Sequence, residues 1–400
     1  MIPYGRQSID EDDIDAVVRV LRSDFLTQGP AVPAFEQAVA ASCGAAEAVA
    51  CSSATAALHM ACLALDVGPG DLVWTSPITF VASANCALYC GAEVGFVDID
   101  PDTFTMSPQR LAEALAQARA AGRLPKVVIP VHMCGQSCDM AAIHALSREY
   151  GFHVIEDASH ALGGSYRGQP VGSCRYSDIA VFSLHPVKII TSGEGGLALT
   201  NDPVLAERLR VLRSHGIVRD PAMMTEEPEG AWVYEQVSLG FNYRLSDLQA
   251  ALGLSQFRRL ETFITRRRAL AARYAQALGG RRDIVLPAEA DGAQSSWHLY
   301  VIRLAEPAHR RQAFDMLRAA GIGVQVHYIP VHRQPFHARQ GFRAGAFPAA
   351  EDYYARAISL PMFPALDDRE QDRVIATVHG VLDSLADQPT SVIEGASGAV

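Results

Sequence analysis

The sequence is short of charged residues and contains no long apolar run. Only 20% of its 400 residues are charged while 49% are hydrophobic, which is enough for a sizeable core. The net charge of −10 argues against nucleic acid or an anionic membrane as a general partner. No apolar run is long enough to span a bilayer, and residues 1–6 do not begin a signal peptide. We therefore expect a cytoplasmic protein that does not bind membranes.

The sequence also lacks the cysteine spacing of a zinc site. Cys134 and Cys138 resemble half of such a site, but no second pair accompanies them. Cys86 and Cys90 have helical spacing in a segment of small residues, which is typical of core packing. We expect all eight cysteines to be reduced and expect no metal site.

Short apolar segments alternate with helical segments between residues 45 and 200. The strands are predicted at residues 48–51, 72–75, 94–97, 127–131, 154–155, 179–182 and 196–199, and helices at 56–65, 108–121 and 141–150. Strands that are apolar throughout and separated by helices indicate an α/β fold, with a mainly parallel sheet covered on both faces. Ligands of such sheets bind beyond the carboxyl ends of the strands.

A long helical stretch at residues 246–278 leads into a second region. That region is predicted to contain strands at 297–304 and 324–328 and helices at 308–320 and 368–385. We therefore expect a large domain at residues 1–255 and a smaller C-terminal α+β domain at 256–386. Residues 387–400 lack aromatic side chains and are rich in Ser, Gly and Ala, so we expect a disordered tail.

Three elements together indicate an enzyme that uses pyridoxal phosphate (PLP). Lys188 follows an apolar strand and can form an imine with an aldehyde cofactor, while Ser183 offers a hydroxyl to its phosphate. Asp157 ends another apolar strand, where a pyridinium nitrogen would find a carboxylate partner. The small residues 52–57 join a strand to a helix and can admit a phosphate at the helix N-terminus, although they can equally well serve only to cap that helix. Any one of these elements alone is more often structural, but their order and spacing favour the enzyme.

From Pro3 to about Val381 the chain resembles the DegT/StrS-type sugar-nucleotide aminotransferases, which are fold-type I PLP enzymes. The resemblance rests on the segments 77–82, 156–160, 182–196 and 240–245. It implies that Lys188 and Asp157 are the catalytic residues. It further implies a set of cofactor-binding residues, namely Ser53, Ala54, Thr55, Phe80, Asp157, His160, Ser183, Lys188 and Asn242. In this family the Asn reaches the phosphate of the partner subunit, which implies a homodimer with shared active sites.

Within the family, segments 2–7, 24–30, 171–178, 214–217 and 325–328 look most like the aminotransferases of pseudaminic acid biosynthesis. This likeness implies a set of substrate contacts: Tyr4, Asp24, Phe25, Leu26, Thr27, Ala54, Ser183, His215, Asn242, Gln325, Val326, His327 and Tyr328. His185, Arg219, Arg244 and His332 are further candidates for binding the donor carboxylate or the diphosphate.

The resemblance implies the transfer of an amino group from L-glutamate, which leaves as 2-oxoglutarate. The acceptor would be C4 of a UDP-linked 2-acetamido-2,6-dideoxy-hexos-4-ulose, giving a UDP-4-amino-4,6-dideoxy-N-acetyl sugar. Asp157 would keep the cofactor ring protonated as an electron sink, and the amine of Lys188 would move the proton. Another 4-keto-6-deoxy sugar linked to dTDP or GDP is an alternative substrate. A sister class of sugar dehydratases has His in place of the lysine, and a non-catalytic PLP-binding regulator is a third possibility.

Overall fold

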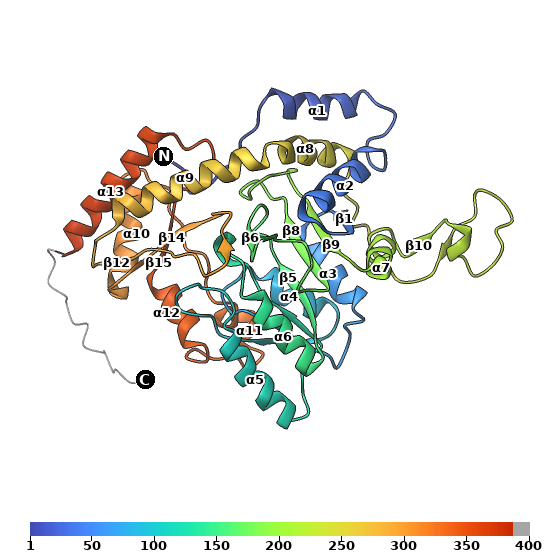
Figure 1. Ribbon diagram of the computed structural model, residues 1–400, viewed down its shortest axis with the longest axis horizontal. Helices are drawn as coiled ribbons and strands as arrows, with labels where there is room; N and C mark the ends of the chain where they lie inside the picture. Colours follow the sequence, from blue (N-terminus) through green and yellow to red (C-terminus); the bar gives the residue numbers. More distant parts are fainter. Residues whose placement is uncertain (387–400) are drawn as a thin grey trace.

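A seven-stranded sheet forms the centre of the molecule in the computed structural model, which describes residues 1–386 (Figure 1). The expected tail at 387–400 lies outside the described residues. The strands follow the order β1-β9-β8-β5-β4-β2-β3. Their bounds are β1 (Glu47–Cys51), β2 (Leu72–Thr75), β3 (Glu93–Phe96), β4 (Val127–Ile129), β5 (His153–Asp157), β8 (Ile179–Ser183) and β9 (Gly196–Thr200). All seven predicted strands are present, and the predicted α/β fold is confirmed.

One strand of this sheet departs from the parallel pattern. β9 is antiparallel to both of its neighbours, β1 and β8, while the other pairs are parallel. β1 therefore points in the same direction as β8 and β5. The carboxyl ends of these three strands, together with the first residue of β9, lie at one edge of the sheet, where an α/β fold binds its ligands.

Helices cover both faces of the sheet, as its apolar strands predict. Ala48 and Ala50 of β1 share a buried cluster with Phe35 of α2 (Ala31–Cys43). Val49 belongs to the opposite cluster, with Ala57 of α3 (Ala54–Ala64). Successive side chains of a strand point to opposite faces, so one short strand helps to build two cores. The remaining helices around the sheet are α1 (Glu11–Leu21), α4 (Ala82–Tyr89), α5 (Pro108–Ala120), α6 (Met140–Tyr150) and α7 (Pro203–Arg213).

The long helical stretch expected at residues 246–278 is two helices, α8 (Asp247–Arg258) and α9 (Leu260–Leu278). Ser246 begins α8 with a capping box that includes Gln249. Arg259 separates the helices with φ −99° and ψ 6°, and its guanidinium forms ion pairs with Asp10 and Asp13. Since α1 follows directly after Asp10, these ion pairs fasten the N-terminal helix to the break. In Figure 1, α9 leads away from the large sheet toward the C-terminal elements.

The C-terminal region is built on a three-stranded antiparallel sheet in the order β12-β14-β15. Its elements are β12 (Ile284–Val285), β14 (Tyr300–Leu304), β15 (Ala357–Leu360), α10 (Arg310–Ala319), α11 (Pro335–Ala338), α12 (Pro348–Arg356) and α13 (Asp368–Ala386). A second small sheet joins β6 (Ser165–Tyr166), β7 (Gln169–Pro170) and β13 (Ala293–Gln294). The region has its own buried cluster, but the domain boundary at residue 255 stays a prediction.

The prediction of a strand at residues 324–328 is wrong. Only Gln325 pairs with a neighbour, in an isolated bridge to Ser359 of β15. Beyond it, His327 hydrogen-bonds the hydroxyl of Ser359, and Tyr328 contacts the large sheet's ligand edge through His160. The segment connects two parts of the molecule through these side chains and does not pair in a ladder. β14 begins at Tyr300, three residues later than predicted, because Trp297 adopts a left-handed φ of 50°.

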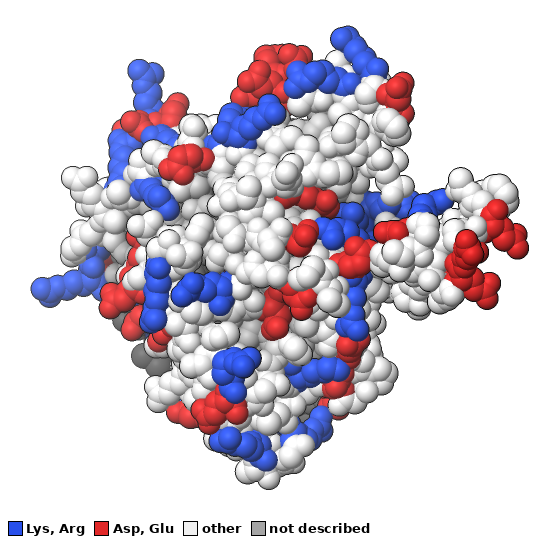
Figure 2. All heavy atoms as spheres, turned by 45° about the vertical axis from the view of Figure 1, so that its right-hand side comes forward, with Lys and Arg blue, Asp and Glu red and all other residues white. Residues whose placement is uncertain are grey.

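A long arm at residues 214–242 projects from the body, with β10 (Ile217–Val218) paired to β11 (Glu235–Gln236) (Figure 1). It exposes large apolar side chains: Trp232, Tyr234, Val237 and Leu239. On the face shown in Figure 2, basic and acidic side chains are interspersed. Within residues 1–386, no helix combines the length and apolar character needed to cross a bilayer. The eight cysteines are free thiols.

Candidate active site

A cavity of about 390 Å³ opens at the ligand edge of the large sheet. Eleven of the residues predicted from the sequence line it: Tyr4, Ser53, Ala54, Thr55, Phe80, Asp157, His160, Ser183, Lys188, His327 and Tyr328. His185, named as a further candidate, also lines it. Residues distributed from the N-terminus to position 328 thus meet in one place, which is the arrangement that the motif order predicts.

The loop between β8 and β9 holds Lys188. Its two ends are adjacent, because Ser183 pairs with Gly196 and the N–H of Leu184 donates to Gly195. The N–H of Lys188 donates to the carbonyl of His185 at 2.9 Å, which closes a turn. Burial lowers the pKa of Lys188 to about 8, and the negative charge of Asp157 opposes part of that shift. The amine can therefore both lose and regain a proton near neutral pH.

Asp157 is buried at the end of β5 and is held by hydrogen bonds to both carboxylate oxygens. The Ser83 hydroxyl donates to Oδ2 at 2.6 Å, and the Ser159 N–H donates to Oδ1 at 3.1 Å. A carboxylate has about four acceptor positions, so each oxygen still has one free for a ring N–H. Burial and these two donors fix where that acceptor lies.

The start of α3 lies beside the lysine loop. Ser53 caps the helix, since its hydroxyl oxygen accepts from the N–H of Ala56 at 3.1 Å. The capping alternative is therefore correct for the Ser53 side chain, but the helix leaves the N–H groups of Ala54 and Thr55 without acceptors of its own. Gly196 approaches so closely that a Cβ placed on it would lie 2.4 Å from the carbonyl carbon of Ser53. These N–H groups, the Thr55 hydroxyl and the positive end of the helix dipole suit a phosphate.

Neutral histidines line the opposite wall of the cavity. His160 Nε2 lies 3.1 Å from the Tyr328 hydroxyl, while its buried Nδ1 has no hydrogen-bond partner within residues 1–386. Burial, and then the nearby charge of Lys188, holds the pKa of His160 well below its usual value and lowers the pKa of His327 to about 4. His298, whose ring centroid lies 4.4 Å from that of His160, belongs to no motif and was not predicted. Thr79 and Ser83 were also missed, although their helical spacing beside Phe80 was visible.

Several predicted residues lie outside this cavity in the single chain. Asp24, Phe25, Leu26 and Thr27 form an exposed loop between α1 and α2, Asn242 is exposed, and Gln325 and Val326 lie beside His327 without lining the cavity. His215 lines a separate hollow of about 440 Å³ at the base of the arm, together with Arg219 and Arg244. His332 is buried against Glu351, 3.0 Å from its carboxylate, and is a structural residue.

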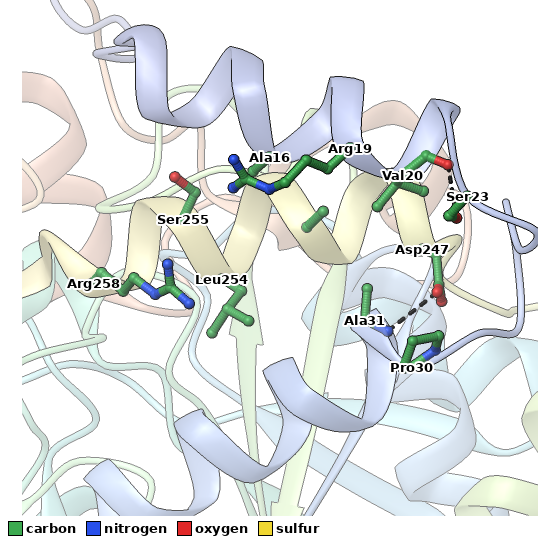
Figure 3. Close-up of a pocket in the computed structure, with 11 residues that line it drawn as sticks. Ala16, Arg19, Val20, Ser23, Pro30, Ala31, Asp247, Leu254, Ser255 and Arg258 are labelled. Atoms are coloured by element: carbon green, nitrogen blue, oxygen red, sulfur yellow. Dashed lines mark hydrogen bonds between the residues drawn. The ribbon is translucent and has the colours of Figure 1, made fainter.

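A third hollow, of about 280 Å³, lies between α1, α2 and α8 (Figure 3). Arg19 and Arg258 line it, and Asp247 accepts a hydrogen bond from the N–H of Ala31 at its lower end. It contains none of the residues predicted from the sequence and shares no lining residue with the Lys188 cavity.

Comparisons with known proteins agree with this geometry. Residues 7–379 match the model of the DegT/DnrJ/EryC1/StrS aminotransferase family. The chain belongs to this family. It is a PLP-dependent sugar aminotransferase of fold-type I, as the motifs predicted.

Three relatives illustrate how far the likeness extends. The spore coat polysaccharide biosynthesis protein SpsC of Bacillus subtilis is 39% identical over 386 residues, covering 95% of this chain and 97% of the relative. The Helicobacter pylori aminotransferase PseC, involved in the biosynthesis of pseudaminic acid, is 29% identical with a TM-score of 0.87, covering 96% and 99% of the two chains. A Streptococcus pneumoniae protein solved in its PLP form is 30% identical with the same TM-score and the same coverage.

The chemical groups that line the cavity of this aminotransferase match those of the cofactor. Lys188 offers an amine with a lowered pKa, and Asp157 offers a buried acceptor for a ring N–H. Ala54 and Thr55 offer N–H groups to a phosphate, and His160 has a buried ring nitrogen without a partner in the described part of the chain. The cofactor needs an amine for its aldehyde, a carboxylate for its ring N–H and N–H groups for its phosphate, and all three line one cavity.

Proposed function

We propose that this aminotransferase transfers an amino group from L-glutamate to C4 of a UDP-linked 2-acetamido-2,6-dideoxy-hexos-4-ulose. The product is a UDP-4-amino-4,6-dideoxy-N-acetyl sugar, as in pseudaminic acid biosynthesis. The observation that carries the proposal is that Lys188, Asp157 and the start of α3 line one cavity together with Tyr4 and His327, two of the predicted sugar-nucleotide contacts. The likeness to PseC supports the choice of sugar.

PLP, when bound, would supply an aldehyde that condenses with an amine and a ring that accepts electrons. The amine of Lys188 would carry the proton from the donor's α-carbon to the aldehyde-derived carbon of the cofactor, and in the opposite direction in the second half of the reaction, which its pKa of about 8 allows near neutral pH. Asp157 holds the ring nitrogen protonated through a charge-assisted hydrogen bond. The N–H groups of Ala54 and Thr55 would hold the phosphate, and the Nδ1 of His160, which has no partner within residues 1–386, would be available to the oxygen of the ring.

Phe80 lies at the mouth of this cavity, 59% exposed, with its ring 6.3 Å from that of Tyr328. An aromatic ring in that position can stack on the face of the cofactor and shield it from water. The side chains that hold the reacting groups thus come from the sheet edge and α3, while the cover comes from the segment before α4.

The division of the predicted contacts between two hollows supports a homodimer with shared sites. His215, Arg219 and Arg244 line the hollow at the base of the arm, and none of them lines the Lys188 cavity. Asn242 lies at the same base, bridged to Ser214. If the arm of one chain reaches the cavity of its partner, the cationic side chains meet the diphosphate of the bound substrate. We also propose that the enzyme works in the cytoplasm.

A panel of 4-keto-6-deoxy sugar nucleotides tests the substrate. The purified holoenzyme is incubated with L-glutamate and each UDP-, dTDP- or GDP-linked candidate, and the products are identified by mass spectrometry. We expect the UDP-linked N-acetyl sugar to be converted with the highest kcat/KM, and 2-oxoglutarate to appear in equal amount. Preferred conversion of a dTDP- or GDP-linked sugar would refute the proposed nucleotide while leaving the reaction type intact.

A further inference from the structure

We propose that Ser83 and Thr79 form a two-hydroxyl relay that positions the Asp157 carboxylate for the cofactor ring, with Ser83 as the residue in direct contact. The inference rests on the proposed role of Asp157. It assigns a function to two side chains that do not belong to the set of residues predicted to hold the cofactor.

Both hydrogen bonds of the relay are short, and its three side chains are buried. Ser83 Oγ lies 2.6 Å from Asp157 Oδ2, and Thr79 Oγ1 lies 2.7 Å from Ser83 Oγ. The exposed fractions of Ser83, Thr79 and Asp157 are 0%, 2% and 5%. Water therefore has little access to replace a missing hydroxyl, and removal of either hydrogen bond leaves a buried polar group without its partner.

The chemistry of the three groups determines which of them donates each hydrogen bond. An ionised carboxylate only accepts hydrogen bonds, so the Ser83 hydroxyl donates to Asp157. Its other neighbour, the carbonyl of Phe80, is more distant at 3.3 Å. With its single proton given to Asp157, Ser83 can only accept from Thr79. The Thr79 hydroxyl therefore donates to Ser83, and two aligned O–H dipoles point at the carboxylate.

Local structure explains why these two residues meet. α4 begins at Ala82, so Ser83 lies in its first turn and Thr79 lies in the bend three residues before the helix, from which its hydroxyl reaches that of Ser83. Phe80 stands between them and turns outward, over half exposed, at the mouth of the cavity. One short segment thus provides both Phe80, which can cover the cofactor ring, and the two hydroxyls that position the Asp157 carboxylate.

The relay fixes the orientation of the Asp157 carboxylate and leaves one acceptor position on each oxygen for the ring. Ser83 occupies one lone pair of Oδ2 and the Ser159 N–H occupies one of Oδ1, so the carboxylate cannot rotate without losing both. Ser83 thereby helps to hold the carboxylate in the orientation in which it can accept the ring N–H.

A double-mutant cycle in the full-length enzyme tests the relay. Ser83→Ala, Thr79→Val, the double variant and Asp157→Asn are compared for the PLP dissociation constant of the apoenzyme and for the rate at which L-glutamate bleaches the visible absorbance of bound PLP. We expect Ser83→Ala to slow bleaching about 10- to 100-fold, the loss of a hydrogen bond to a charged group, with half-saturation by glutamate unchanged within about twofold. PLP binding should weaken about 3- to 10-fold, since the ring contact is one of several.

The coupling between the two sites decides the result. Thr79→Val should slow bleaching less than Ser83→Ala and have no further effect in the Ser83→Ala background, because it acts through Ser83. Ser147→Ala is the matched control, since Ser147 is a buried helical serine of α6 whose hydroxyl donates to a backbone carbonyl. It should leave both readouts unchanged.

Independent, additive effects of Ser83→Ala and Thr79→Val would overturn the relay, as would wild-type bleaching and PLP binding in Ser83→Ala. Asp157→Asn separates this failure from a failure of the proposed function. If Asp157→Asn also bleaches and binds PLP like the wild type, the role of Asp157 itself is wrong. If only Asp157→Asn is impaired, the carboxylate acts without the relay.

Discussion

Gly196→Ala should damage the phosphate site without touching any side chain that binds the cofactor. A Cβ at Gly196 would lie 2.4 and 2.5 Å from the carbonyl carbon and oxygen of Ser53 and 2.6 Å from the nitrogen of Ala54. All three atoms are backbone at the first turn of α3, so the helix start or β9 must shift. Overpacking of this kind costs about 1–3 kcal/mol, and contact with backbone places this case at the upper end.

The shift moves the N–H groups that we assign to the phosphate, so PLP affinity should fall with stability. We expect the urea midpoint of the apoenzyme to drop and the PLP dissociation constant, measured by fluorescence titration, to rise at least about tenfold, which corresponds to about 1.4 kcal/mol. Gly68→Ala is the control, because nothing lies within 4 Å of its added Cβ, and its effect should stay within about 0.5 kcal/mol. Unchanged PLP affinity in Gly196→Ala would refute the assignment of the phosphate to this helix start.

Four further outcomes follow from the site. Borohydride reduction of the holoenzyme should label Lys188 in a peptide map, and Lys188→Ala should abolish turnover; a label on another lysine would contradict the assignment. Because burial lowers the pKa of Lys188 to about 8, the unfolded chain binds more protons than the folded apoenzyme between pH 8 and the ordinary lysine value of 10.5. The free energy of unfolding should therefore rise over that window by about 1–3 kcal/mol relative to Lys188→Met, after allowance for screening at the open cavity, and a flat difference in urea titrations would rule this out. Asp157→Asn should lower kcat about 100-fold or more with an unchanged fold by circular dichroism, and near-normal turnover would disprove its pairing with the ring. Inactive Lys188→Ala and Asn242→Ala chains, mixed and refolded, should recover about a quarter of wild-type activity if sites are shared across a two-fold dimer; mixed dimers without recovery would place Asn242 outside the partner's site.

The sequence was sufficient for the elements whose signals are local. The seven strands of the large sheet are apolar on both faces, and the residues that end β5 and β8 could be placed at the ligand edge from strand direction alone. The antiparallel direction of β9 could not be predicted, because an apolar strand buried on both faces has the same pattern in either orientation. The strand predicted at residues 324–328 was wrong because His327 and Tyr328 make side-chain contacts with two different parts of the molecule and do not pair in a ladder.

In the candidate site, too, the residues in local motifs were predicted and those brought in by tertiary contacts were not. Lys188, Asp157 and the start of α3 belong to contiguous motifs and were found from spacing. His298 lines the cavity and Ser83 contacts Asp157 only because the fold brings them there, Ser83 and Asp157 being 74 positions apart in sequence. No local pattern distinguishes such a serine from the many that only satisfy the first turn of a helix.

The antiparallel turn from β8 into β9 also determines how the catalytic lysine moves. Ser183, the last residue of β8, pairs with Gly196, the first residue of β9, so the twelve residues between them form a loop that the hydrogen bonds of the sheet close at its base. The Leu184 N–H and the Ser192 N–H continue that closure, donating to Gly195 and Leu184. Opening the loop therefore requires opening the central sheet, and in hydrogen exchange these two amides should exchange as slowly as those of β8. The lysine is carried on a loop, yet the base of that loop belongs to the hydrogen-bond ladder of the central sheet.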